Sequence, residues 1–183
     1  MLDLFPTDDQ APMRRNVSTV LATLPVPTTG LDDVNGLERV DWLVLDDTSD
    51  SPAILNGAPR ILKNVLLVEV GLRFMDLYKN QPDLGRISDQ LGEHGFRLLR
   101  LSDARYHSHF PETTGYKGLS GSQLVAAKAI FIPDETRAQT LDTNQQRKLA
   151  LILDAAYGCV DLAFNTLSRV DESTAQAYLN AND

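Results

Sequence analysis

Residues 40–70 read VDWLVLDDTSDSPAILNGAPRILKNVLLVEV, and this stretch decides the fold. Both of its ends, residues 40–46 and residues 65–70, contain short continuous apolar runs. Such runs are typical of strands that are covered on both faces, as in a parallel sheet. Between them, Ser51 followed by Pro52 is a good helix start, because a hydroxyl can cap a helix and proline is favoured at its first position. The stretch therefore predicts a strand, a short helix and a second strand.

Two further strands are predicted downstream, over residues 96–101 (FRLLRL) and residues 124–132 (LVAAKAIFI). A helix before the first of them is indicated by Asp83, which can cap its start, and by Gly95, which can close it. Residues 102–122 are polar and hold three glycines, so we expect a long loop there. Strands that alternate with helices favour an α/β fold with a largely parallel sheet.

The clearest helix of the sequence lies near the C-terminus. Thr143 and Gln146 fit a capping box, and apolar residues recur behind them at helical spacing. Gly158 weakens the middle of this pattern and predicts a break into two helices. The neighbouring Cys159 is expected to be a packing residue.

Length and composition indicate a single globular domain. The chain has 183 residues, and 43% of them are apolar, which is ordinary for a globular protein. We divide it into a loose N-terminus (residues 1–15), one α/β domain (residues 16–170) and a C-terminal tail (residues 171–183). The one cysteine excludes an intramolecular disulfide and a Cys-rich zinc site.

The charge of the chain narrows its partners. A net charge of −8 repels both a nucleic-acid backbone and an anionic membrane surface, so we expect neither as a partner. Residues 1–10 lack the basic start and apolar run of a signal peptide, and the run at residues 65–70 is too short to span a bilayer. A cytoplasmic protein is therefore expected, with a small molecule as its substrate if it is an enzyme.

Several segments carry a resemblance to a known family. Residues 40–62 resemble the fourth strand and following helix of FkbM-type, S-adenosylmethionine-dependent methyltransferases. The matching residues are Asp41, Trp42, Leu43, Leu45, Asp46, Ile54, Leu55, Gly57 and Ala58. Residues 65–101 resemble the next segment of that family, through Glu69, Leu77, Tyr78, Gln81, Pro82 and the turn His94–Gly95–Phe96. The motifs TTGLDDV (residues 28–34) and GSQLVAAKAIFIPD (residues 121–134) resemble its Leu-Asp-Asp turn and its last strand.

This resemblance implies a fold and an activity. The fold is an incomplete class I methyltransferase sheet, Rossmann-like, with flanking helices and an antiparallel pair formed by its last two strands. The activity is transfer of a methyl group from S-adenosylmethionine to a hydroxyl of a small molecule or sugar.

Two departures from the family's pattern affect the cofactor. No glycine precedes Gly30, so the Gly-rich turn that would bind S-adenosylmethionine is missing. Thr48, Ser49 and Ser51 stand where the family has an acidic or amide residue, a glycine and a glutamate. We therefore expect the isolated chain to bind S-adenosylmethionine weakly or not at all. The alternative function is a noncatalytic remnant or interaction module that needs a partner chain.

Asp46 and Glu69 are the candidate catalytic residues. Asp46 ends a strand and precedes a helix, where ligands of α/β sheets bind, and its carboxylate can accept a substrate proton. The alternative for Asp46 is a solvated turn that caps the helix. Glu69 lies within an apolar strand, so it is either a functional carboxylate in a cleft or a structural pair with Arg73 or another base.

Tyr78 and His107 are the candidates for contact with the substrate. His107 and His109 are two residues apart, which suits one face of a strand, but a metal site needs a third ligand and none is apparent nearby. We predict no metal site, and the alternative for the histidines is an exposed pair. Tyr78 either contacts the substrate or shapes a loop together with Gln81 and Pro82.

The strand over residues 40–46 has a further consequence. In the family's sheet it lies centrally, beside the strand that carries the Gly-rich turn. Without that neighbour it becomes an edge, which is a template for association. We therefore expect it either to pair with another chain, in a homo-oligomer or with a different partner, or to be covered by residues 16–27.

Overall fold

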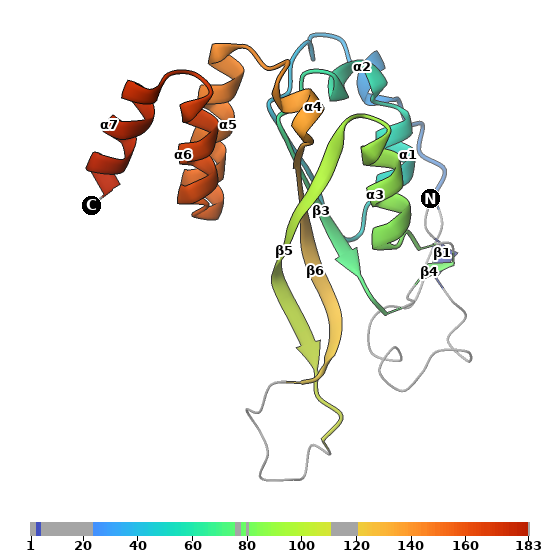
Figure 1. Cartoon of the computed structure of the whole chain (residues 1–183). Helices are drawn as coiled ribbons and strands as arrows, with labels where there is room; N and C mark the ends of the chain where they lie inside the picture. Colours follow the sequence, from blue (N-terminus) through green and yellow to red (C-terminus); the bar gives the residue numbers. More distant parts are fainter. Residues whose placement is uncertain (1–2, 5–23, 76–77, 80, 111–120, 183) are drawn as a thin grey trace.

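The computed structural model describes residues 3–4, 24–75, 78–79, 81–110 and 121–182. In this part of the chain the fold is α/β, with an open mixed sheet of four strands and helices on both faces (Figure 1). The sheet contains β2 (Trp42–Leu45), β3 (Leu67–Arg73), β5 (Phe96–His107) and β6 (Gln123–Pro133), in the spatial order β2-β3-β6-β5. All four predicted strands are confirmed.

The strand directions correct one expectation. Only β2 and β3 are parallel, while β6 is antiparallel to both of its neighbours, so the sheet is mixed rather than largely parallel. The reason is that β5 and β6 follow one another in the chain and pair directly, as hairpin strands do. The antiparallel pairing expected for the last two strands is confirmed, and β2 lies at the edge of the sheet.

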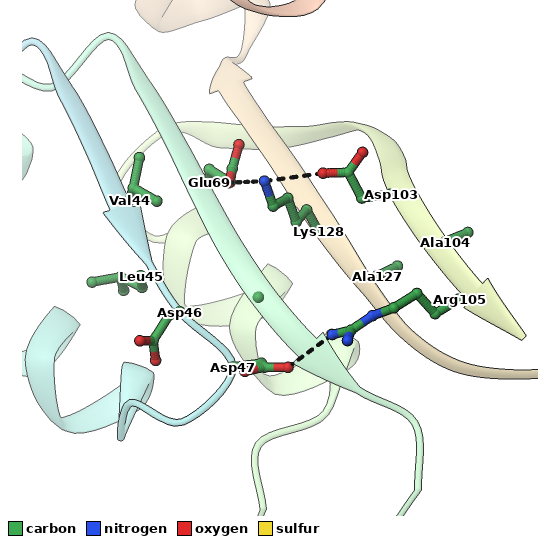
Figure 2. Close-up of a pocket in the computed structure, with 11 residues that line it drawn as sticks. Val44, Leu45, Asp46, Asp47, Glu69, Asp103, Ala104, Arg105, Ala127 and Lys128 are labelled. Carbon is green, nitrogen blue, oxygen red and sulfur yellow. Dashed lines mark hydrogen bonds and ion pairs between the residues drawn. The ribbon is translucent and has the colours of Figure 1, made fainter.

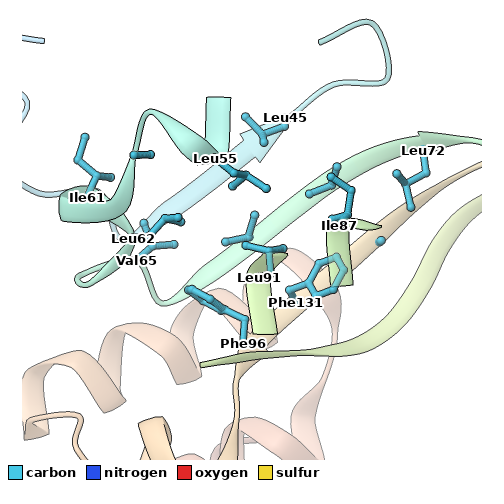
Figure 3. Close-up of a cluster of buried hydrophobic side chains, with 14 residues drawn as sticks. Leu45, Leu55, Ile61, Leu62, Val65, Leu72, Ile87, Leu91, Phe96 and Phe131 are labelled. Atoms are coloured by element: carbon cyan, nitrogen blue, oxygen red, sulfur yellow. The ribbon is translucent and has the colours of Figure 1, made fainter. Parts of the chain in front are cut away.

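Three helices cover one face of the sheet. They are α1 (Ser51–Asn56), α2 (Pro59–Leu62) and α3 (Leu84–Gly92), and they pack on a buried apolar cluster (Figure 3). Phe131 and Phe96 supply its largest side chains, and Leu55, Ile61 and Ile87 reach it from the helices. Since β2 contributes Leu45 to this cluster, the edge strand is anchored on this side.

The other face is covered by α5 (Thr143–Tyr157) and α6 (Val160–Ser168), which follow the short α4 (Glu135–Ala138). Helix α7 (Glu172–Asn182) lies outermost and packs on α6 (Figure 1). A second apolar cluster fills the space under them, and it includes Cys159 and Ala175. Cys159 is therefore a packing residue, as predicted. Residues 171–183, which we predict to be a tail, contain α7.

The helix starts differ from prediction by one residue. Asp50 caps α1 by accepting a hydrogen bond from the amide of Ala53, and Ser51 is the first helical residue rather than the cap. Likewise, the capping box of α5 is formed by Asp142 and Gln145 instead of Thr143 and Gln146. In both cases a carboxylate stands directly before the hydroxyl residue and accepts the hydrogen bond in its place.

Gly158 ends α5 in the left-handed conformation, with φ 60°, and α6 begins at Val160. The predicted break into two helices is confirmed. Asp83 caps α3 through the amide of Arg86, also as predicted.

The predicted long loop at residues 102–122 is wrong in its first part. Strand β5 continues to His107, and the hairpin of β5 and β6 extends beyond the helices (Figure 1). Most residues of β5 are exposed, so its last part carries polar side chains and reads like a loop. Residues 111–120 lie outside the described part of the chain. Tyr78 lies on a separate short strand, β4 (Tyr78–Lys79), which pairs with β1 (Asp3–Leu4).

Arg137, in α4, connects the segment before β3 to the turn before β5. Its guanidinium donates hydrogen bonds to the carbonyl oxygens of Leu62 (2.6 Å), Val65 (2.7 Å) and His94 (2.5 Å), and it lies 4.1 Å from the centroid of the Phe96 ring. Burial lowers the pKa of Arg137.

No helix in the described ranges has both the length and the apolar character needed to cross a membrane.

Candidate functional site

An open cavity of about 570 Å³ lies at the carboxyl end of β2 and beside the middle of β3 (Figure 2). It is lined by Val44, Leu45, Asp46, Asp47, Glu69, Gly71, Asp103, Ala104, Arg105, Ala127 and Lys128. The cavity arises because the cluster under α5 and α6 includes Leu67 and Ile130 but ends before Glu69 and Lys128 are reached. The structure thus brings the two predicted catalytic residues, Asp46 and Glu69, to one cavity.

Glu69 is the buried charge at the centre of this site. Only 7% of the residue is exposed, yet its carboxylate has two partners. Tyr157, the last residue of α5, donates a hydrogen bond to Oε2 at 2.7 Å, and Nζ of Lys128 lies 3.2 Å from Oε1. The base that pairs with Glu69 is therefore Lys128 of the neighbouring strand, while Arg73 pairs with Asp47.

Lys128 and Tyr157 both keep their protons in this arrangement. Hydrogen bonds from Lys128 to Asp103 and Glu69 raise the pKa of the ammonium group. Burial, followed by the contact with Glu69, raises the pKa of Tyr157 well above its ordinary value, so the phenol acts as a donor. The Tyr157 ring also makes an edge-to-face contact with Trp42, with 5.8 Å between centroids. These contacts hold the end of α5 against the edge strand.

A second cavity of about 390 Å³ adjoins the first and reaches Trp42 and Tyr157. The two cavities share Val44, Glu69, Asp103 and Lys128. We call them together the cleft. Its walls carry carboxylates and cations in close alternation, which suits a neutral polar ligand better than a strongly charged one.

Asp46 occupies the turn that follows β2. Its Oδ1 accepts hydrogen bonds from the Thr48 amide (2.8 Å), the Thr48 hydroxyl (2.7 Å) and the Ser49 hydroxyl (3.0 Å). The Thr48 hydroxyl lowers the pKa of Asp46 most, followed by the Thr48 amide and the Ser49 hydroxyl. Because these hydrogen bonds all reach Oδ1, Oδ2 is the oxygen that a ligand can use. Thr48 and Ser49 are thus the residues that orient Asp46.

Asp47 and Gly71 shape the floor of the cleft. Oδ2 of Asp47 lies 3.0 Å from Arg73 and 3.1 Å from Arg105. Gly71 allows the turn to approach β3, since a Cβ atom on Gly71 would lie 2.6 Å from the amide nitrogen of Asp47. Gly71 was not among the candidates predicted from the sequence, although a glycine inside a strand is a signal for such a close approach.

Asp103 was also missed, and no local sequence signal marks it. It lies where the pairing of β5 with β6 is irregular, and its backbone is left-handed, with φ 51°. This irregularity places its carboxylate 3.0 Å from Nζ of Lys128.

Of the two predicted substrate contacts, only His107 has a side chain in the described part of the structure, and it lies outside the cleft. His107 is near the end of β5, its ring centroid is 5.0 Å from that of His109, and neither histidine lines the cleft. Tyr78 is on β4, and its side chain is outside the described part of the structure. Among the residues that the structure describes, no three potential metal ligands lie close enough to hold an ion.

Searches for matching models of known protein families, for similar curated proteins and for similar solved structures found none.

Proposed function

We propose that this chain is a methyltransferase-like module whose cleft binds a hydroxylated small molecule. The observation that carries the proposal is the geometry of Asp46 at the carboxyl end of β2. Three hydrogen bonds hold its Oδ1, and its Oδ2 is available to a ligand. Support for the methyltransferase class comes from the resemblance over residues 16–165 and from the sheet order β2-β3-β6-β5, which is compatible with it.

The described residues do not fit S-adenosylmethionine itself. Its carboxylate and ribose call for free backbone amides at a Gly-permitted turn and for an acidic partner. In the turn after β2, the amides of Thr48 and Ala53 are already bound by Asp46 and Asp50. We therefore assign acceptor binding to this chain, and methyl transfer depends on a cofactor-binding segment seated next to β2.

Asp46 acts on the bound hydroxyl as an acceptor. Its lowered pKa keeps it ionised at neutral pH, which favours a short hydrogen bond from a ligand hydroxyl to Oδ2. The same lowered pKa makes it a weak general base, because proton abstraction is most effective when the pKa of the base lies near the working pH. Asp46 therefore orients the hydroxyl rather than deprotonating it in the ground state.

Glu69 has a different part in this proposal. Its two oxygens are held by Tyr157 and Lys128, so it fixes the ammonium of Lys128 at the wall of the cleft. That ammonium remains partly exposed and can donate a hydrogen bond to a second oxygen of the ligand. Asp46 and Lys128 together suit a polyol or sugar with several hydroxyls.

Calorimetric titration with methyl glucoside, a neutral polyhydroxylated probe, tests the proposal. We expect weak, millimolar binding by the wild type and a clear loss in Asp46→Asn. The matched control is Asp50→Asn. Asp50 is a nearby aspartate that caps α1 and does not line the cleft, so this variant should bind like the wild type. Equal binding by all three proteins contradicts the role of Asp46. A separate titration with S-adenosylmethionine should give no binding in the micromolar range.

A second candidate function is a noncatalytic interaction module, and one observation favours it. Trp42 and Val44 of the edge strand are 41% and 52% exposed. Apolar side chains on a sheet edge are typical of a surface that binds another chain.

A further inference from the structure

The two parts of the cleft are lined by different residues at their ends. Asp46 lines only the first part, of about 570 Å³, and Trp42 lines only the second, of about 390 Å³. Val44 and Lys128 border both. Trp42 and Asp46 are four residues apart, which corresponds to about 13 Å of extended chain. The cleft is therefore longer than a single sugar ring.

Trp42 gives the second part of the cleft a flat apolar surface. It is 41% exposed, and an edge-to-face contact with the ring of Tyr157 holds it in place. Tyr157 is fixed in turn by its hydrogen bond to Glu69 and by Arg100, which donates a hydrogen bond of 2.6 Å to the Tyr157 carbonyl oxygen. Because the indole is positioned before a ligand arrives, little freedom is lost when a ligand packs on it.

Groups that can bind hydroxyls lie in the same part of the cleft. The ammonium of Lys128 contacts Glu69 and Asp103, and since it has three N–H donors, one remains for a ligand oxygen. Asp103 contacts Lys128 through Oδ2, and its side chain is 68% exposed, so Oδ1 can accept a hydrogen bond from a ligand hydroxyl. Ser102 adds a hydroxyl to the lining. A flat aromatic surface with a few polar groups around it is typical of a small-molecule site.

A pyranose ring has the chemistry that this arrangement recognises. Its hydroxyls project from the rim of the ring, and its C–H groups leave the faces apolar. One face can therefore pack on an indole while the hydroxyls at the rim bind polar groups. An acyclic polyol has no fixed apolar face, so it gains less from Trp42.

A groove beside β2, on the α1 side, offers a ligand another direction. It has a volume of about 1320 Å³ and lies between residues 24–31 and α1. No aromatic side chain is among the described residues that line it. Of residues 16–27, which are expected to cover β2, residues 24–27 form no strand with it, and residues 16–23 lie outside the described part of the chain. The aromatic surface that suits a sugar ring is the one that Trp42 supplies in the cleft.

We propose that the cleft binds a ligand of two linked sugar rings. The first ring lies between Asp46 and Lys128, with one hydroxyl at Oδ2 of Asp46. The second ring packs on Trp42 and bonds to Asp103, and Val44 lies at the junction of the two rings. This inference rests on the proposed function, because it takes the Asp46 end of the cleft as the place of the first ring. It concerns the face of the sheet and is independent of what binds the outer edge of β2.

Calorimetric titration with two probes tests the proposal. Methyl glucoside has one ring, and methyl cellobioside has two. We expect the wild type to bind methyl cellobioside roughly tenfold more tightly, because the second ring buries apolar surface against an indole. Trp42→Leu should abolish this difference and leave the affinity for methyl glucoside unchanged. The matched control Tyr106→Leu removes another exposed aromatic ring, on β5 and outside the cleft, and should keep the difference.

Fluorescence gives a second measurement that needs no substitution, since Trp42 is the one tryptophan of the chain. Saturating methyl cellobioside should protect Trp42 from quenching by acrylamide, because the second ring covers the indole. Methyl glucoside, which fills only the Asp46 end, should leave the quenching unchanged.

Three results overturn the inference. They are equal affinities of the wild type for the two probes, a difference in affinity that survives Trp42→Leu, and acrylamide quenching that methyl cellobioside does not reduce. The proposed function stands in each case if the wild type binds methyl glucoside and Asp46→Asn does not. If the wild type binds neither probe, the proposed function and this inference fail together.

Discussion

Replacing Lys128 by methionine tests what its charge contributes, because the shape of the cleft changes little. The change removes the ammonium that lies 3.2 Å from Glu69 but keeps most of the side chain's apolar length. At that distance the Coulomb energy of the pair is about 1.3 kcal/mol with the dielectric constant of water and about 5 kcal/mol at an effective value of 20. The Lys128 side chain is 45% exposed and that of Glu69 only 9%, so solvent screening favours the lower end.

We therefore expect Lys128→Met to lower the free energy of unfolding by about 1–2 kcal/mol, or roughly 2–8 °C in Tm for a chain of this size. Glu69→Gln keeps the acceptor for the Tyr157 hydroxyl and removes the charge. The double variant should then be more stable than the sum of the single effects implies, with a coupling energy near 1 kcal/mol. Urea unfolding followed by circular dichroism measures all four proteins. A coupling energy of zero within error refutes the view that this pair balances the buried charge of Glu69.

Three further predictions concern the turn, the core and the last helix. Gly71→Ala should destabilise the protein by about 1–3 kcal/mol in thermal unfolding, because its Cβ would press on Asp47. Arg137→Met should cost about 2–4 kcal/mol in the same assay, since it leaves three carbonyl oxygens without their donor. The hydroxyl of Ser173, followed by Thr174, lowers the pKa of Asp171 to about 2. The folded pKa lies below the ordinary value of 3.8, so the support that Asp171 gives to α7 is complete above that value and is lost as the pH falls towards about 2. Amide exchange in α7 should show this acid dependence in the wild type, and Asp171→Asn should abolish it.

The parts of the fold that could be predicted from the sequence are those marked by short stretches of apolar residues. Residues 40–46 and 65–70 each contain a short continuous apolar run, and each range includes part of a strand of the sheet. Because these strands are parallel and Val44 lies opposite Glu69, the carboxyl end of β2 lies beside the middle of β3, and Asp46 and Glu69 line one cavity. The strand pattern predicted the strand of each candidate, but not that the two would share a cavity.

The remaining features depend on contacts that no local pattern records. Tyr157 binds Glu69 from 88 residues away, and this contact exists only once α5 is laid across the sheet. Asp103 reaches Lys128 through an irregularity in β5, a strand whose polar residues favoured a loop. His107 was expected in a long loop, although its spacing from His109 suits one face of a strand; it is the last residue of β5 and does not line the cleft.

The most direct test of the proposed function is to locate the bound ligand. Titration of isotopically labelled protein with methyl glucoside, followed by amide chemical shifts, reports the contact residue by residue. We expect the largest shifts at Thr48 and Ser49, which orient Asp46, and at Gly71 and Lys128. Shifts confined to residues 24–31 beside the groove, or to the arm of the hairpin around His107, would contradict it.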